Sequence, residues 1–411
     1  MTALHIQAEP AEVGMCAERL ARIDTHFQRY IDDGRLPGWL ITVSRNGKLV
    51  HLSTAGHRDV EASLPVELDT IWRIYSMTKP ITAVAALMLW EEGGFELNDP
   101  LSDYIPSFAD TKVWRSGSVT NPILEPQSNP MRLWHLMSHT AGLTYGFMYA
   151  HPVDELYRRA GFDFGVKQQD DLAGFCERIA ALPLVFQPGS EWNYSMGLDV
   201  LGRVIELVSG ATFDEFLRTR LFGPLGMNET GWWVEPEQAH RLASLYGAHP
   251  ATGKAIPLGA VGAGALQPPA APMGGGGLVS TAGDYHRFTQ MLRNGGQLDG
   301  VRVLSPRTVA YMASNHLPGG ADLTAFGRPL FSETTFDGVG FGLGVSVTID
   351  PVKGKVPGSV GEYAWGGAAS TAFWVDPHED LTVQFFTQLL PSSTHPIRSE
   401  LKQLVHQSLI D

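Results

Sequence analysis

The feature that most constrains this sequence is an apolar run that starts at a proline and follows a serine and a lysine. The segment reads Ser76-Met77-Thr78-Lys79-Pro80 and continues as ITAVAALMLWEEGG. Proline lacks an amide hydrogen and is tolerated only in the first helical turn, so a helix must begin near Ser76. The run is almost entirely apolar, which predicts a helix covered on all sides that ends at Gly93-Gly94.

Ser76 and Lys79 lie three residues apart, so the first turn of this helix places them on one face. The helix dipole and the free amide groups at a helix start stabilise negative charge on a serine oxygen or on an oxyanion. Burial lowers the pKa of a lysine and makes it a possible base. Ser76 is therefore a candidate nucleophile and Lys79 a candidate base.

The same spacing occurs a second time, in Ser399-Glu400-Leu401-Lys402. This copy lies midway along a polar helical pattern, where both side chains would be solvated. A bare Ser-x-x-Lys pattern is thus no evidence for catalysis. The apolar helix and the proline at its start are what select Ser76.

Composition narrows the class of protein. The chain has 411 residues, of which 44% are hydrophobic and 18% charged, as expected of a soluble globular protein with two structural lobes. Its net charge of −13 argues against a nucleic-acid partner and against an anionic membrane surface. No apolar run reaches the length of a membrane span, and no phosphate loop or dinucleotide fingerprint is present. We therefore expect a small-molecule substrate and no nucleotide cofactor.

The first fourteen residues contain neither a basic region nor an apolar core, so the sequence shows no signal peptide. Cys16 and Cys176 are isolated, with no metal-ligand spacing and no disulfide framework. These features predict a cytoplasmic protein with two reduced thiols.

Both ends of the chain carry strand patterns. The Asn46-Gly47 dipeptide predicts a hairpin between two early strands. The predicted strands cover 39–44, 49–52, 70–74, 341–349, 370–375 and 381–389, and the predicted helices cover 17–33, 131–137, 170–181, 196–209, 213–221, 284–293, 305–313 and 396–409.

This pattern predicts an α+β fold in which an antiparallel sheet, built from both chain ends and flanked by helices, carries an inserted, mostly helical lobe. We expect residues 1–90 and 270–411 to form the sheet domain and residues 91–269 the helical domain, with the active site at their interface. Residues 246–277, rich in glycine, alanine and proline, are expected to form a return loop.

A serine–lysine pair needs a further proton carrier, and Tyr194 is the best candidate. It follows a Pro-Gly turn and directly precedes a helical pattern. A tyrosine at such a junction can point into a cleft, where a nearby Lys79 ammonium would favour its phenolate and make it a general base. The alternative is a packed aromatic side chain with a hydroxyl at the surface.

A second oxyanion donor is predicted in Trp365-Gly366-Gly367-Ala368, at the start of the strand near Ser370. Two glycines let a ligand approach the backbone closely and leave an N–H free to donate. The alternative is a β-bulge.

The order Ser-x-x-Lys, Tyr-Ser-x and Trp-Gly-Gly resembles the family VIII carboxylesterases, serine hydrolases similar in fold to class C β-lactamases and penicillin-binding DD-peptidases. The resemblance covers most of the chain and includes residues 134–143 and 276–282. It implies that Ser76 is the nucleophile and that Lys79 and Tyr194 form the base system. It also implies an oxyanion hole made by the N–H groups of Ser76 and Ala368, with no metal or organic cofactor.

Two departures from the β-lactamase pattern bear on the substrate. Met196 stands where lactamases carry an asparagine that binds the substrate amide, and it offers no useful hydrogen bond. Trp365 replaces the lysine that attracts a substrate carboxylate, and an indole offers an apolar wall instead. Losing both contacts removes roughly 2–5 kcal/mol of recognition for an anionic amide. We therefore expect a neutral ester with a short-to-medium acyl group and at most weak β-lactamase activity.

Several other functions remain open from the sequence. The chain contains no Gly-x-Ser-x-Gly pentapeptide, which argues against a Ser-His-Asp esterase. His135 and His139 have the spacing of metal ligands but lack the glutamate of a zincin, and His139 is expected to be a structural hydrogen-bonding residue near the site. The alternatives to the esterase are an acyltransferase, a β-lactamase or D-amino-acid peptidase, and a non-catalytic penicillin-binding-type protein.

Overall fold

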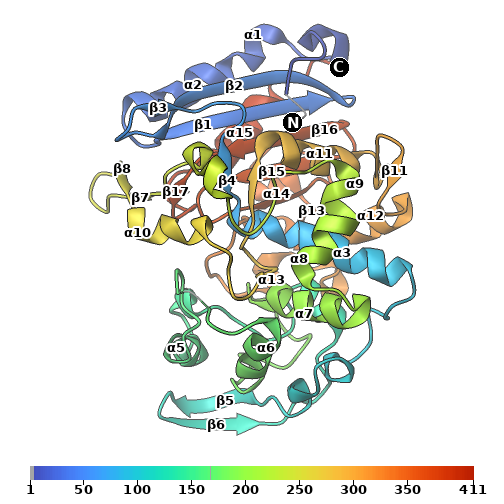
Figure 1. Ribbon diagram of the computed structural model, residues 1–411. Coiled ribbons are helices and arrows are strands. Elements are labelled where there is room, and N and C mark those ends of the chain that lie inside the picture. Colours follow the sequence, from blue (N-terminus) through green and yellow to red (C-terminus); the bar gives the residue numbers. More distant parts are fainter. Residues whose placement is uncertain (1–3, 167) are drawn as a thin grey trace.

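The computed structural model describes residues 4–166 and 168–411, and an eight-stranded antiparallel sheet forms its centre (Figure 1). Strands from the two chain ends pair directly, since β1 (Gly38–Arg45) lies between β2 (Lys48–Asp59) and β16 (Leu381–Phe386). The spatial order is β12 (Val339–Phe341), β13 (Ser346–Thr348), β14 (Tyr363–Gly366), β15 (Ala372–Asp376), β16, β1, β2 and β3 (Leu64–Pro65).

Strand β1 shows why the sheet is central. Every residue of the strand is buried, although its side chains alternate between the two faces. Ile41 and Val43 belong to one hydrophobic cluster and Leu40 to the other, so both faces are covered. The predicted hairpin is confirmed, because Asn46 and Gly47 have φ angles of 52° and 73° between β1 and β2.

Helices cover both faces of the sheet. The outer helices α1 (Ala17–Leu20), α2 (Arg22–Asp32) and α15 (Ile397–His406) share one hydrophobic cluster with β1, β15 and β16. On the other face, Tyr285 of α11 (Ala282–Arg293) stacks edge-on against Phe373 and Phe386. The predicted α+β architecture, built from both chain ends, is thus confirmed.

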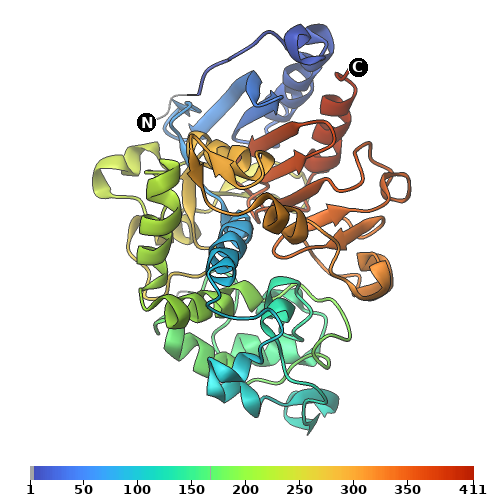
Figure 2. The ribbon, with the colours of Figure 1, turned by 90° about the vertical axis from the view of Figure 1, so that its right-hand side faces the viewer.

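Helix α3 (Thr78–Glu91) lies between the sheet and the remaining helices, and all its residues from Thr78 to Leu89 are buried. Figure 2 shows it in light blue, with the sheet above it and a helical region below. The other helices are α4 (Leu133–Met137), α5 (Pro152–Arg159), α6 (Leu172–Ala180), α7 (Gly197–Ser209), α8 (Phe213–Leu217), α9 (Gly223–Leu225), α10 (Gly259–Gly262), α12 (Pro306–Met312), α13 (Leu323–Phe326) and α14 (Pro351–Gly354). In the part of the chain that the structure describes, no helix is both long and apolar enough to cross a membrane.

Short strand pairs lie outside the main sheet. Two of them occur in regions where the sequence predicted helices or a loop. The predicted helical region contains the hairpin β5–β6, and the predicted return loop contains β7 and β8, which pair with each other while β7 also pairs with β17. The short strands are β4 (Ile71–Arg73), β5 (Val113–Ser118), β6 (Asn121–Glu125), β7 (Tyr246–Ala248), β8 (Ala255–Pro257), β9 (Val279–Thr281), β10 (Gln297–Leu298), β11 (Val301–Arg302) and β17 (Leu389–Leu390).

Other predicted elements also differ from those observed. The helix expected over 17–33 breaks at Ala21 into α1 and α2. The strand expected over 341–349 is two strands, because Gly344, with a φ of 85°, lies in a turn between β12 and β13. The strand β14 was missed: the Trp-Gly-Gly segment ends this strand and does not begin the next one.

Candidate active site

Ser76 lies where a strand meets the buried helix. Strand β4 pairs with β9, and the chain then turns through Tyr75, whose φ of 43° is unusual for a residue with a side chain. A 3₁₀ turn, η2 (Tyr75–Met77), leads directly into α3. Ser76 is thereby held at the start of α3, as its proline-defined helix predicted, and it is only 8% exposed.

Lys79, the second residue of α3, lies beneath Ser76. Its Nζ is 3.3 Å from Ser76 Oγ and donates to the carbonyl of Gly275 at 2.5 Å. Burial lowers the pKa of Lys79 to about 8, while the charges of Asp199 and Glu333 act in the opposite direction. A neutral amine within reach of the serine is therefore accessible near physiological pH.

Tyr194 contacts Ser76 from the other side. Its hydroxyl donates to Ser76 Oγ at 2.5 Å, and Lys79 Nζ lies 4.5 Å from the centroid of its ring. Burial, followed by the charge of Glu333, raises the pKa of Tyr194 well above its ordinary value. This direction is opposite to that of the Lys79-stabilised phenolate expected from the sequence, because desolvation is the largest cause of the shift in the pKa of Tyr194.

Asp199 and Gly275 belong to the same site as Ser76 and Lys79, and the sequence analysis did not identify either of them. Asp199, on α7, is 3% exposed and accepts the Gly275 N–H at 2.6 Å, while burial raises its pKa to about 6. A Cβ at Gly275 would lie 2.4 Å from the Asp199 carboxylate, so glycine is required there. The available signal was an acidic residue in the first turn of a mostly apolar helix, five positions after Tyr194.

The Trp365–Ala368 segment contributes to the site in an unexpected way. Ala368 lines the cavity above Ser76, in the turn between β14 and β15. Trp365, however, is 2% exposed and packs edge-on behind Tyr194, so it is not the apolar wall that was expected. A Cβ at Gly366 or Gly367 would collide with Arg398 or with the Ile74 carbonyl, so these glycines permit close packing.

The cavity above Ser76 has a volume of about 850 Å³. Met196 lies in its wall, together with six aromatic side chains: Tyr75, Tyr145, Phe147, Phe164, Tyr194 and Phe331. The charged side chains in the wall are acidic: Asp163, Asp199 and Glu333. Among the described lining residues there is no lysine or arginine, and Lys79 lies beneath the floor. The cavity therefore suits neutral or cationic ligands better than anionic ones.

The two histidines weighed as metal ligands have other partners. His139 leaves the end of α4 with a φ of 58° and contacts Ser195 Oγ at 3.0 Å, with its ring edge-on to Tyr194. Burial and the charge of Lys79 lower the pKa of His139 well below its ordinary value, so the ring is neutral. His135 accepts the N–H of Arg132. His139 is thus a structural hydrogen-bonding residue beside the site, as expected.

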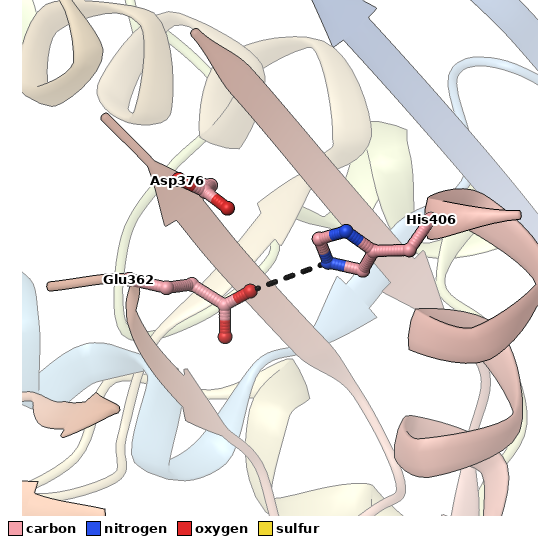
Figure 3. Close-up of side chains that lie close together, drawn as sticks. All are labelled: Glu362, Asp376 and His406. Atoms are coloured by element: carbon pink, nitrogen blue, oxygen red, sulfur yellow. Dashed lines mark ion pairs between the residues drawn. The ribbon is translucent and has the colours of Figure 1, made fainter. Parts of the chain in front are cut away.

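One group of described residues, Glu362, Asp376 and His406, offers ligand atoms for a metal (Figure 3). Glu362 directly precedes β14, Asp376 is the last residue of β15 and His406 is the last residue of α15. One possible ligand atom from each residue lies within 4.8 Å of those from the other two. Lys402 already donates to the other oxygen of Glu362. Lys402 and His406 keep the pKa of Glu362 low despite burial. Lys402 already compensates one of the two carboxylates, and a divalent cation beside it would exceed their combined charge. We therefore interpret the group as a buried ion cluster.

Comparison with known proteins agrees with this architecture. A family model described as "Beta-lactamase" matches residues 23–407. Protein Rv1367c of Mycobacterium tuberculosis is 35% identical over 88% of each chain, and Esterase EstB of Burkholderia gladioli is 31% identical over 90% of this chain and 91% of its own. The solved structure of EstCE1, "a hydrolase with promiscuous acyltransferase activity", superimposes with a TM-score of 0.78 at 27% identity, over 96% of this chain and 99% of its own.

The chain therefore belongs to the β-lactamase family of serine hydrolases, and within it to the esterase-like branch that the sequence motifs resemble.

Proposed function

We propose that this protein is a serine carboxylesterase that hydrolyses neutral esters through an acyl-enzyme on Ser76. The observation that carries the proposal is the position of Ser76 Oγ between Lys79 Nζ at 3.3 Å and Tyr194 Oη at 2.5 Å, at the floor of an apolar and acidic cavity. A nucleophile in contact with two proton carriers is the arrangement that acyl transfer requires.

In the proposed acylation, neutral Lys79 accepts the Ser76 proton as Oγ attacks the ester carbonyl carbon. The carbonyl oxygen becomes an oxyanion that accepts hydrogen bonds from the N–H groups of Ser76 and Ala368, each contributing on the order of 3 kcal/mol. The C–O bond then breaks, and the departing alkoxide takes the proton of Tyr194. The Lys79 ammonium returns a proton to Tyr194.

Deacylation follows the same route with water as the nucleophile. Water loses its proton to the Lys79–Tyr194 pair as its oxygen attacks the acyl carbon, and Ser76 recovers a proton when the acid leaves. This assignment replaces the Tyr194 phenolate expected from the sequence, because burial keeps the phenol protonated while it lowers the pKa of Lys79 to about 8.

The cavity sharpens the expected substrate. Its volume of about 850 Å³ and its aromatic wall accept a group larger than a short acyl chain. Met196 in the wall offers no amide-binding hydrogen bond, and the acidic side chains disfavour a substrate carboxylate. We therefore propose neutral esters with an apolar acyl or alcohol group, and only slow hydrolysis of carboxylate-bearing β-lactams.

The test is hydrolysis of p-nitrophenyl butyrate by the wild type and by Ser76→Ala, with intact mass recorded during turnover. We expect activity and a butyryl adduct with the wild type only. A fully active Ser76→Ala would place the catalytic serine elsewhere. Inactivity of both proteins would contradict ester hydrolysis.

Acyl transfer to an alcohol is the second candidate function, because the structurally similar EstCE1 is described as having promiscuous acyltransferase activity. The acyl-enzyme is common to both reactions, and only the acceptor differs. Adding 1-butanol to the p-nitrophenyl butyrate assay and measuring butyl butyrate against butyric acid distinguishes them. Ester formation that exceeds acid release at low butanol concentration would favour the transferase.

A further inference from the structure

A single arginine from the C-terminal helix contacts both ends of the turn that carries Ala368. Arg398 is the second residue of α15, and its Nη2 donates to the carbonyl oxygens of Gly367 at 3.3 Å and Thr371 at 3.1 Å. Gly367 directly follows β14 and Thr371 directly precedes β15. One planar guanidinium therefore spans the base of the β14–β15 turn.

Glu333 fixes that guanidinium from the opposite side. Arg398 Nη2 lies 2.5 Å from Oε2 of Glu333, and Nη1 donates to the Glu333 carbonyl at 2.6 Å. Ser392 also donates to the same carboxylate oxygen, at 2.9 Å. Glu333 is 2% exposed and lines the Ser76 cavity, and Arg398 is its ion-pair partner.

The two glycines of the segment show how tightly the turn is held. A Cβ at Gly366 would lie 2.1 Å from Arg398 Nη2, and a Cβ at Gly367 would lie 2.4 Å from the carbonyl oxygen of Ile74. Ile74 is two residues before Ser76. The turn is therefore confined between the arginine on one side and the chain leading to the nucleophile on the other.

We propose that Arg398 and Glu333 are positioning residues that hold the Ala368 N–H at the oxyanion position facing Ser76; this rests on the proposed acyl transfer. Within the described residues the Ala368 N–H has no hydrogen-bond acceptor, whereas the neighbouring Gly367 N–H is bonded inside the turn at 2.9 Å. Ala368 also lines the cavity. The β14–β15 turn thus leaves the Ala368 N–H free to bind a ligand, while Arg398 binds the carbonyl groups at both ends of the turn.

The proposal predicts an effect on the transition state rather than on substrate binding. An oxyanion donor stabilises charge that develops only as the tetrahedral intermediate forms, and a displacement of about 1 Å costs on the order of 10²-fold in rate. Losing Arg398 removes a side chain that donates to both carbonyls of the turn. Ground-state binding depends mainly on the apolar wall and is expected to change little.

Glu333 provides a second, electrostatic readout. Its charge acts with that of Asp199, from α7, to raise the pKa of Lys79 against the effect of burial. Glu333→Gln removes that charge, so the pH–rate profile is expected to shift to lower pH. A purely structural contact would leave the profile where it is.

The experiment compares Arg398→Met, Arg398→Lys and Glu333→Gln with the wild type. We expect Arg398→Met to lower kcat for p-nitrophenyl butyrate by about 10- to 100-fold with KM within about threefold. Affinity for butylboronic acid, which forms a tetrahedral adduct on serine, should fall by a similar factor. Arg398→Lys should restore part of kcat, because one ammonium compensates Glu333 but lacks the planar fork.

Arg302→Met is the matched control, since Arg302 Nη1 also donates to two main-chain carbonyls, Gly295 at 3.2 Å and Leu304 at 3.1 Å, beside the β10–β11 hairpin. It should keep full kcat. If Arg398→Met also keeps its kcat and its affinity for butylboronic acid, the Arg398–Glu333 ion pair has only a structural role and the inference is wrong. If Arg398→Met does not fold, Glu333→Gln decides, and an unchanged kcat and pH profile would overturn the inference.

Failure of the proposed function is a separate outcome. An inactive wild type would contradict ester hydrolysis. The positioning role would still be tested by butylboronic acid, whose adduct on Ser76 is detected by mass spectrometry and whose affinity is measured by calorimetry. An active wild type with unaffected Arg398 and Glu333 variants would contradict the positioning role alone.

Discussion

The two Ser-x-x-Lys segments of this chain have the same spacing and both lie on helices, yet their surroundings differ. Ser76 contacts Lys79 and Tyr194 at the start of the buried helix α3. Ser399, on α15, donates to the carbonyl of Pro396 at its own helix start, and Lys402 forms an ion pair with the buried Glu362. The second lysine was expected to be solvated, and this expectation is wrong.

The difference shows what makes a lysine a base. Lys402 has a carboxylate in direct contact and forms an ion pair with it. Lys79 has carboxylates only at a distance, in Asp199 and Glu333, so burial dominates and its pKa falls. A lysine without a contacting carboxylate at a buried helix start can accept a proton, whereas one in an ion pair contributes to packing.

The largest expected effect separates the two serines. Ser76→Ala should reduce kcat for p-nitrophenyl butyrate by on the order of 10⁴-fold or more, because it removes the atom that forms the acyl-enzyme. Ser399→Ala should leave kcat unchanged. Steady-state assays on both variants check this, and a strong loss in Ser399→Ala would break the comparison.

Substitution of Lys79 should lower activity, whereas substitution of Lys402 should lower stability. Lys79→Met should lower kcat by about 10³-fold, as expected for removal of a general base, with the fold retained. Lys402→Met should keep its activity per folded molecule but lose about 3 kcal/mol of unfolding free energy, because it leaves the Glu362 carboxylate buried without its partner. Urea unfolding and kinetics on the same samples test both, and a stable Lys402→Met protein would contradict the ion-pair assignment.

A smaller effect concerns the charge of the substrate. The acidic wall above Ser76 should make kcat/KM for methyl 4-acetoxybenzoate about tenfold higher than for 4-acetoxybenzoate, which differs mainly in carrying a carboxylate. A carboxylate-bearing cephalosporin should likewise be turned over far more slowly than a neutral ester. Equal kcat/KM values for the ester pair at low salt would contradict this reading of the cavity.

The smallest expected effect is a shift in pH dependence. Because proposed catalysis needs neutral Lys79, kcat/KM should rise with pH through about 8. Asp199→Asn removes a charge that raises the pKa of Lys79, so the midpoint should move to lower pH by about half a unit to one unit.

The matched control for this shift is Asp163→Asn, which alters another acid of the cavity wall that is not among the groups acting on Lys79. Its midpoint should stay in place. An equal shift in both variants would mean that the general charge of the cavity, and not Asp199, sets the pKa.

Much of the fold followed from local pattern. The buried helix after Pro80, the Asn46-Gly47 hairpin and the pairing of both chain ends in one antiparallel sheet were predicted correctly. Strand β14 was missed because it has only four residues, and its glycine-rich end favours a turn. The β5–β6 hairpin was missed because the prolines around it favour loops.

The sequence by itself predicted which residues would carry the proposed chemistry: Ser76 and Lys79 on one face of a buried helix, with Tyr194 and Ala368 supplied by later segments. Tertiary structure decided how they act. Burial keeps Tyr194 protonated and lowers the pKa of Lys79, Asp199 and Gly275 complete the site, and Arg398 and Glu333 meet at the turn that carries Ala368. Spacing along a chain fixes neighbours within a helix, but desolvation and long-range contacts depend on what the fold packs around them.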